Sequence, residues 1–214
     1  MSMLGYTVAP ISYDDSIPWL LEKHYAKRMP SVSFSFGLFK SHVLIGVLTI
    51  GKPASGVLCE TLCGKDNCDY VYELNRVVLE NNIKNEASWF MARCFRLLPK
   101  PMILVSYADK KHHHSGYIYQ ATNWIYTGLS AKRTDRQPIE YDGNKHSRHM
   151  RYECHEGTET VERSRKHRYV LFIGDKRQKK KFKDALVYDV LDYPKEKVIH
   201  YDTSAKIVTQ MTLI

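Results

Sequence analysis

The sequence has no apolar run long enough to cross a bilayer. The longest candidate, Val43 to Ile50, has the length of a strand, whereas a spanning helix needs about 18 apolar residues. The first residues do not show a charged segment, an apolar stretch and a cleavage site in series, so no secretory signal is expected. Repeats and low-complexity segments are also absent. We therefore expect one globular cytoplasmic domain, for which 214 residues provide a sufficient core.

The sequence has few cysteines, and their spacing matches no common metal-binding motif. There are five cysteines and no Cys-x2-Cys motif. The spacing of Cys59, Cys63 and Cys68 differs from that of a zinc knuckle. Free thiols in a reducing compartment are the favoured interpretation, and a metal site at these three residues is the alternative.

Acidic residues are outnumbered, 23 against 32 Lys and Arg, which gives a net charge of +9. Such a balance favours polyanionic partners, because each phosphate contact releases condensed counterions. From about Ala131 basic residues crowd together, first up to Arg151, then from Arg163 to Arg168, and again from Lys176 to Lys183. Charge alone leaves nucleic-acid binding and an ordinary basic surface equally open.

Periodicity predicts alternating strands and helices. Val32, Phe34, Phe36 and Leu38 alternate with small polar residues, as in a half-buried strand. The predicted strands are 6–11, 31–39, 43–50, 70–79, 102–107, 124–127 and 169–173. The predicted helices begin at Asp14 or Asp15, cover 86–98 and 117–122, and follow Asp175. Segments 51–69 and 142–157 are predicted loops.

This order predicts an α/β (α+β) fold with a mixed, mostly antiparallel central sheet flanked by helices. Residues 1–130 form the predicted core. Residues 131–214 form a predicted basic extension that packs on the core and contacts DNA.

Four stretches resemble the Mom family of phage DNA-modification proteins when taken in order and spacing. They are Lys23–Tyr25, Tyr72–Val78, Val105–Asp109 and Gly116–Trp124, and Lys166–Val170 and Asp192–Lys195 are also similar. The resemblance covers roughly residues 20 to 195.

The resemblance implies a fold like that of GNAT acyltransferases and an enzyme that attaches a carbamoylmethyl (acetamido) group to adenine N6. It implies double-stranded DNA as partner, protection from restriction, and the host cytoplasm as location. It also implies acetyl-CoA or another acyl or glycine-type donor, with Fe(II) as a candidate metal. No membrane partner is expected, and a homodimer is compatible with the resemblance.

Two departures from the family patterns matter. The GNAT phosphate loop is absent before the helix at Glu86, and a carboxylate there opposes an anion at the helix N-terminus. In the second departure, His114 takes a matching histidine position and His113 replaces a glycine.

The resemblance selects three groups of site residues, and each has a structural alternative such as core packing, helix capping or a solvated loop. The predicted catalytic residues are His24, Tyr25, Asp109 and Tyr119, with His24 and Asp109 as metal ligands. The predicted cofactor-binding residues are Arg76, Ser88 and Ser106. The predicted substrate and DNA contacts are His114, Tyr117, Asn123, Trp124, Arg168, Lys176 and Lys180.

Glu73 and Arg76 are charged residues on a predicted strand. Being three positions apart, they should point to opposite faces and not pair with each other. Arg76 either joins a structural ion pair elsewhere or binds an anionic donor or DNA.

The implied product sets a chemical constraint. Adenine N6 lies inside the duplex, so the base must be extruded at a cost of roughly a few kcal/mol. Acyl transfer joins nitrogen to a carbonyl carbon, whereas a carbamoylmethyl group is joined through CH2. A metal-activated or glycine-like donor would meet this constraint. Two other functions stay open: N-acyl transfer to a small amine or protein, and DNA binding without catalysis.

Overall fold

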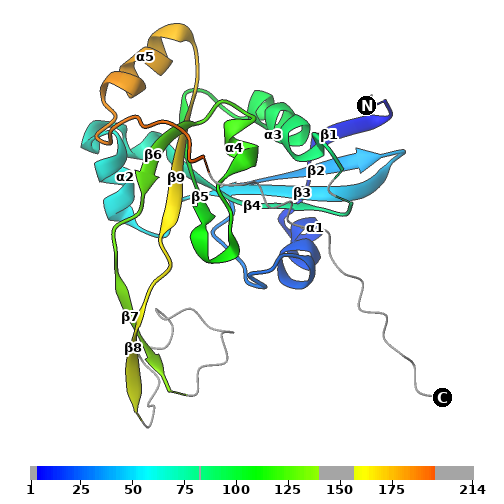
Figure 1. The fold of residues 1–214 in the computed structure, drawn as a ribbon. Helices are drawn as coiled ribbons and strands as arrows, with labels where there is room; N and C mark the ends of the chain where they lie inside the picture. Colours follow the sequence, from blue (N-terminus) through cyan, green and yellow to red (C-terminus); the bar gives the residue numbers. More distant parts are fainter. Residues whose placement is uncertain (1–3, 82, 140–156, 196–214) are drawn as a thin grey trace, which may run out of the picture.

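The computed structural model describes residues 4–81, 83–139 and 157–195. Their main element is a seven-stranded sheet with the order β1-β2-β3-β4-β5-β9-β6 (Figure 1). Its strands are β1 (Tyr6–Pro10), β2 (Phe34–Lys40), β3 (Val43–Gly51), β4 (Val71–Leu79), β5 (Met102–Asp109), β6 (Ile125–Leu129) and β9 (Lys166–Ile173). Only β4 and β5 pair in parallel. The predicted mixed, mostly antiparallel sheet is confirmed.

Helices cover both faces of the sheet. They are α1 (Tyr13–Pro18), continued by the π-helical turn η1 (Trp19–Lys23), then α2 (Gly56–Leu62), α3 (Glu86–Leu97), α4 (Tyr117–Gln120) and α5 (Lys176–Asp184). The 3-10 turns are η2 (Lys65–Tyr70) and η3 (Lys110–His112). Helices α3 and α4 share a core cluster on one face. On the other face α1 with η1, and α2 with α5, bury two further clusters.

Local sequence explains two helix starts. Ser12 caps α1 and forms a capping box with Asp15, so the cap lies two residues earlier than the predicted Asp14. Asp175 caps α5 in a second box with Gln178, as predicted. Phe182 anchors α5 because it is buried among the apolar residues beneath it.

The prediction of a loop over 51–69 is wrong. This segment holds α2, capped by Ser55, and η2. Leu62 and Cys63 are buried against Val71 and neighbouring apolar residues. The glycine, cysteine and polar residues of this segment give no clear helical period. Its short apolar face is stabilised by packing on the sheet, which the local sequence does not reveal.

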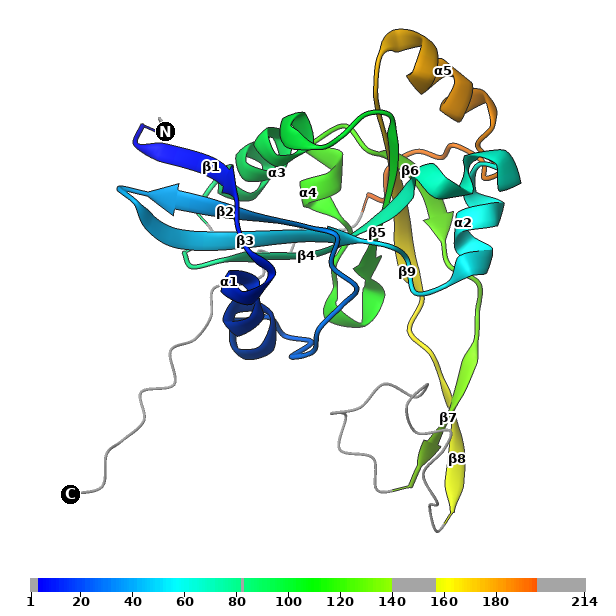
Figure 2. The same cartoon turned by 180° about the vertical axis from the view of Figure 1, so that it is seen from behind.

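The basic C-terminal part contributes to the sheet itself, because β9 lies between β5 and β6. A separate hairpin of β7 (Thr134–Pro138) and β8 (Thr158–Glu162) projects away from the sheet (Figures 1 and 2). Most of the loop predicted over 142–157 lies outside the described residues.

Within the described ranges, no helix combines the length and apolarity that a membrane crossing requires. Four cysteines in these ranges, Cys59, Cys63, Cys68 and Cys94, are free thiols, in agreement with the favoured interpretation.

Candidate active site at the divergence of two strands

Strands β4 and β5 pair for only a short distance. Their parallel register runs from Val71 opposite Ile103 to Glu73 opposite Val105, and then ends. Beyond this point a side-chain hydrogen bond joins the two strands in place of backbone pairing, because Ser106 Oγ lies 2.8 Å from the carbonyl oxygen of Leu74. The two strands therefore diverge halfway along the sheet, and residues from both line the gap.

A β-bulge at Asn75 changes which way the charged residues of β4 point. Thr49 opposes Arg76 and Gly51 opposes Glu73, so Asn75 is the extra residue. Thr49 and Gly51 are two positions apart and face the same side, and so must Glu73 and Arg76. The prediction that they point to opposite faces is wrong, because an inserted residue shifts the alternation. The Asn75 side chain is held by Thr49 at 2.6 Å.

Glu73 and Arg76 bring opposite charges to the gap. Burial raises the pKa of Glu73, and the nearby Arg76 opposes that shift. Among the described residues, the Glu73 carboxylate has no hydrogen-bond or ion-pair partner. Arg76 donates from Nη1 to the Asn75 carbonyl at 2.6 Å, but its buried Nε has no partner in the described part of the chain. The gap thus offers a proton acceptor and an unused donor side by side.

Tyr119 reaches the gap from α4 on the other face of the sheet. Its phenol oxygen lies 2.8 Å from Ser106 Oγ. The Leu74 carbonyl can only accept, so the Ser106 proton goes to Leu74 and the phenol donates to Ser106. Burial raises the pKa of Tyr119 to about 12, with Tyr25 and Glu73 acting in the same direction. Tyr119 is therefore a neutral phenol within electrostatic reach of Tyr25 and Glu73.

His24 follows η1 and lies buried beside this gap. Its Nδ1 accepts a hydrogen bond from the Ala26 N–H at 3.0 Å, which places the proton of the neutral ring on Nε2. Burial lowers the pKa of His24 to about 3, and the charges of Arg76 and Arg28 add to that shift. His24 is thus a neutral hydrogen-bond donor at ordinary pH.

Tyr25 and His114 form the outer wall of the gap between β4 and β5. The ring centroids of Tyr25 and His24 lie 4.3 Å apart. The rings of Tyr25 and His114 are nearly perpendicular, with their centroids 6.2 Å apart. Desolvation raises the pKa of Tyr25, Arg76 opposes that shift and Asp109 adds to it. Tyr25 is 61% exposed, so this wall lies at the protein surface.

The depressed pKa of His24 gives a stability prediction. Between pH 6.5 and the folded pKa near 3, the unfolded chain binds the proton more readily, so stability falls as pH falls through this window. From pH 8 to pH 5 the wild type should lose about 2 kcal/mol more unfolding free energy than His24→Gln. Urea unfolding at both pH values measures this. Equal losses in the two proteins would contradict the neutral, buried state of His24.

Asp109 ends β5 next to this wall, but its carboxylate is already engaged. Oδ1 accepts from Ser164 Oγ at 2.5 Å and from the Lys111 N–H at 3.0 Å, and Oδ2 lies 3.3 Å from Lys166 Nζ. Burial alone would raise the pKa of Asp109, but these partners outweigh it and hold the pKa below its usual range. Asp109 therefore caps η3, which is the structural alternative considered for it.

The predicted metal pair of His24 and Asp109 lacks supporting donors. The described residues contain no group of three or more His, Cys, Asp or Glu side chains that could hold a metal ion. Both Asp109 oxygens already have partners, and Nδ1 of His24 is occupied by Ala26. These residues therefore do not fit Fe(II).

The start of α3, where Ser88 is a predicted cofactor-binding residue, lacks the GNAT phosphate loop. Glu86 is buried there, and its Oε2 accepts from the Ile83 N–H at 3.2 Å. Ser88 donates to the Asn85 carbonyl at 3.1 Å, and α3 covers the sheet face opposite Arg76. A buried carboxylate thus stands in the first turn of α3, where it would repel an anion.

Several predicted DNA contacts lie away from the gap or in the core. Trp124 is fully buried against Phe95 and Tyr119. Arg168 is buried, donates from Nε to Thr127 at 2.8 Å and stacks on Tyr188. Neither side chain is accessible to a base or a phosphate in this structure. Tyr117 and Asn123 are exposed near α4.

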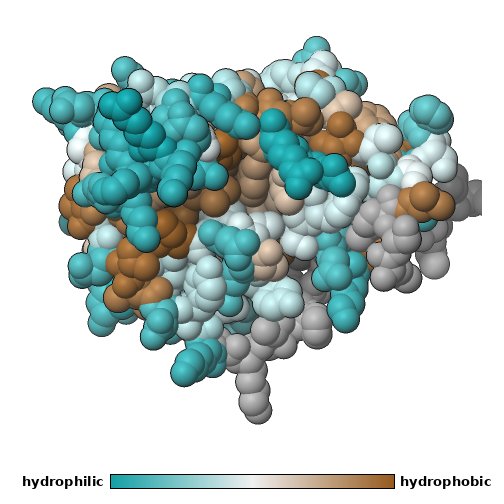
Figure 3. Space-filling view, turned by 90° about the horizontal axis from the view of Figure 1, so that it is seen from above, coloured by the Kyte–Doolittle hydropathy of each residue, from teal (hydrophilic) through white to brown (hydrophobic). Residues whose placement is uncertain are grey.

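Lys176 and Lys180 lie on α5, beyond the opposite end of the sheet. Ile173, just before α5, pairs with Met102, whereas Asp109 pairs with Lys166. Met102 lies four residues from Ser106, where the gap begins, and seven from Asp109 at its far end, which is roughly 13 Å and 23 Å along the strand. Figure 3 shows hydrophilic side chains gathered over α5 at this end. These lysines are therefore distant from the gap.

The fold and the site together describe a mixed αβ protein with a polar, partly buried site where two parallel strands separate. The chain belongs to the Mom protein family, whose model matches residues 5–195. It is 32% identical over 142 residues to "Methylcarbamoylase mom" of Escherichia phage Mu. That match covers 59% of this chain and 57% of the relative, so the chain spans less than two thirds of the relative's length.

Solved acetyltransferase structures are similar in shape. One is yncA of Salmonella typhimurium, a putative acetyltransferase with its cofactor acetyl-CoA, at TM-score 0.47 and 10% identity over 80% of this chain and 95% of that chain. Another is an N-acetyltransferase of Staphylococcus aureus Mu50, at TM-score 0.45 and 12% identity over 78% and 98%.

Proposed function

We propose that this protein is a transferase that modifies adenine in double-stranded DNA, adding a carbamoylmethyl group to N6 in a phage-infected cell. Membership of the Mom family and the name of the phage Mu relative support this reaction. The modification would protect DNA from restriction, as the resemblance implies.

One observation carries the proposal. Residues picked from distant stretches of sequence, namely His24 with Tyr25, Arg76, Ser106 and Tyr119, surround one gap between β4 and β5. Residues chosen by chance would be scattered over the structure, and two other predicted site residues, Lys176 on α5 and Ser88 on α3, do lie elsewhere.

The gap suits an extruded adenine chemically. Exposed Tyr25 offers a ring face on which a flipped base can stack. When N6 forms a bond to carbon it must lose a proton, and Glu73 is a carboxylate of the gap without a partner in the described ranges. Within those ranges Arg76 Nε also has no acceptor, so it can donate to an acceptor atom of the base or of the transferred group.

The donor is the less defined half of the reaction. An acyl or glycine-type donor, with acetyl-CoA among the candidates, is the class that the sequence resemblance implies. Because Glu86 places a carboxylate in the first turn of α3, the phosphates of such a donor would have to bind elsewhere.

Nucleoside mass spectrometry tests the function. DNA from cells expressing the chain should contain an adenine nucleoside heavier by one carbamoylmethyl group, absent from cells carrying the empty vector. Salt-sensitive DNA binding with unmodified nucleosides would instead indicate a binding module. An acetylated small amine or protein with unchanged DNA would indicate N-acyl transfer.

A further inference from the structure

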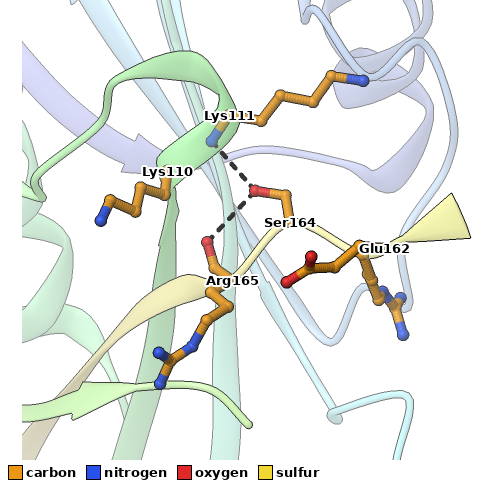
Figure 4. A pocket seen from close by; sticks show the side chains of 6 residues that line it. Lys110, Lys111, Glu162, Ser164 and Arg165 are labelled. Atoms are coloured by element: carbon orange, nitrogen blue, oxygen red, sulfur yellow. Dashed lines mark hydrogen bonds between the residues drawn. The ribbon is translucent and has the colours of Figure 1, made fainter. Parts of the chain in front are cut away.

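A basic depression lies beside the site, at the base of the β7–β8 hairpin. Lys110, Lys111, Arg163 and Arg165, with Glu162 and Ser164, line an open hollow of about 410 Å³ (Figure 4). Sites for small molecules are enclosed and mostly lined by apolar groups. A shallow hollow lined almost entirely by charge is better suited to an extended polyanion.

Three of these cations are available. Arg163 lies 3.6 Å from Asp135 and is partly neutralised. Lys110, Lys111 and Arg165, here called the cationic trio, have no carboxylate partner within the part of the chain that the structure describes. Arg165 uses Nε to bond the Ser130 carbonyl at 2.8 Å, which leaves its terminal nitrogens for a ligand.

The backbone under the cationic trio is fixed. The Lys111 N–H donates to Asp109 Oδ1 at 3.0 Å and to Ser164 Oγ at 3.1 Å. The Lys110 N–H donates to the Arg165 carbonyl at 3.2 Å. In Figure 4 the three side chains spread outward around Ser164. The charges are thus held by one scaffold, with little backbone ordering left for a ligand to impose.

Asp109 links the depression to the candidate active site. Ser164, which lines the depression, donates to Asp109 Oδ1 at 2.5 Å, and the Asp109 carbonyl accepts from the His114 N–H at 3.2 Å. The His114 ring in turn meets the exposed Tyr25. A ligand bound to the cationic trio would therefore lie next to the open wall of the gap.

We propose that the cationic trio binds the phosphates of the DNA strand that flank the extruded adenine. This inference rests on the proposed function and assigns the DNA grip to this depression, away from the lysines of α5. Successive phosphates of one strand are about 3.4 Å apart along the helix axis, so one strand presents several charges to a hollow of this size. These contacts position the duplex and carry no sequence information.

The test is DNA affinity of the full chain measured against salt concentration. Lys110→Gln combined with Lys111→Gln should lower the slope of log affinity against log salt by about 2, and weaken binding roughly 60-fold at 0.1 M salt, if each lysine contacts one phosphate. The matched control is Lys179→Gln with Lys181→Gln on α5, which removes the same charge from exposed positions. Its slope should stay near that of the wild type.

The outcomes are separable. Equal losses of affinity in the two double variants would mean that only net charge matters and would overturn the proposal. Unchanged DNA binding with weakened binding of CoA would assign the cationic trio to a donor's phosphates and would also overturn it. DNA binding is measured without the reaction, so the two proposals can fail separately. A reduced salt slope in the Lys110/Lys111 variant would support DNA binding by the cationic trio even if the wild type modified no adenine. The lack of modification would then contradict only the proposed function. Circular dichroism and thermal unfolding of both variants confirm folding.

Discussion

Replacing Glu73 with glutamine is expected to lower the rate of adenine modification by roughly 10²- to 10⁴-fold. Glutamine keeps the size of the side chain but cannot accept the N6 proton. Since the Glu73 carboxylate is largely desolvated and has no hydrogen-bond partner in the described ranges, its loss should leave the unfolding free energy unchanged or higher. Modified nucleoside formed per minute, with DNA affinity measured in parallel, checks this.

The pH profile separates proton transfer from positioning. Burial raises the pKa of Glu73 above the ordinary 4.5, so the ionised fraction falls earlier as pH is lowered. The wild-type rate should fall with it, and the residual rate of Glu73→Gln should lack this decline. Glu80→Gln is the control. Glu80 directly follows β4, but its carboxylate forms a half-buried ion pair with Lys23. A Glu73→Gln rate within a few-fold of wild type would exclude Glu73 as the proton acceptor.

The second large effect is expected from Gly116→Ala, which should lower the unfolding free energy by roughly 2 to 5 kcal/mol. Gly116 has φ +83°, and a Cβ there would lie 2.3 Å from the ring of the fully buried Tyr169. Gly116 also precedes α4, which carries Tyr119 to Ser106. Activity should therefore fall together with stability, as read from chemical unfolding and nucleoside analysis.

Two further variants identify the cause. Gly56→Ala places the same methyl group in open space at ordinary φ and should be close to neutral. Gly116→Asn tolerates positive φ better than alanine, yet it meets the same ring. If Asn proves much milder than Ala, backbone strain decides the effect, and the close contact with Tyr169 does not.

Local sequence patterns predict most strands of the sheet. Alternation over 31–39, the helical period over 86–98 and the cap at Asp175 are local signals, and each element formed where its own residues demand it. The resemblance likewise selected His24, Tyr25, Arg76 and Tyr119 before any contact was known. The resemblance could not separate these residues from Trp124 and Arg168, which are buried and inaccessible. Burial depends on which other parts of the chain pack against a residue.

The way in which these residues act together depends on contacts between distant strands. The bulge at Asn75 turns Glu73 to the face of Arg76, and it arises from the pairing of β4 with β3 and from the hold of Thr49 on Asn75. The insertion of β9 beside β5 brings Ser164 and Lys166 to Asp109 and so engages its carboxylate. The same pairing sets Arg165 beside Lys110, some 55 residues away in the chain. Register between distant strands follows from the summed packing of whole surfaces, which no local pattern encodes.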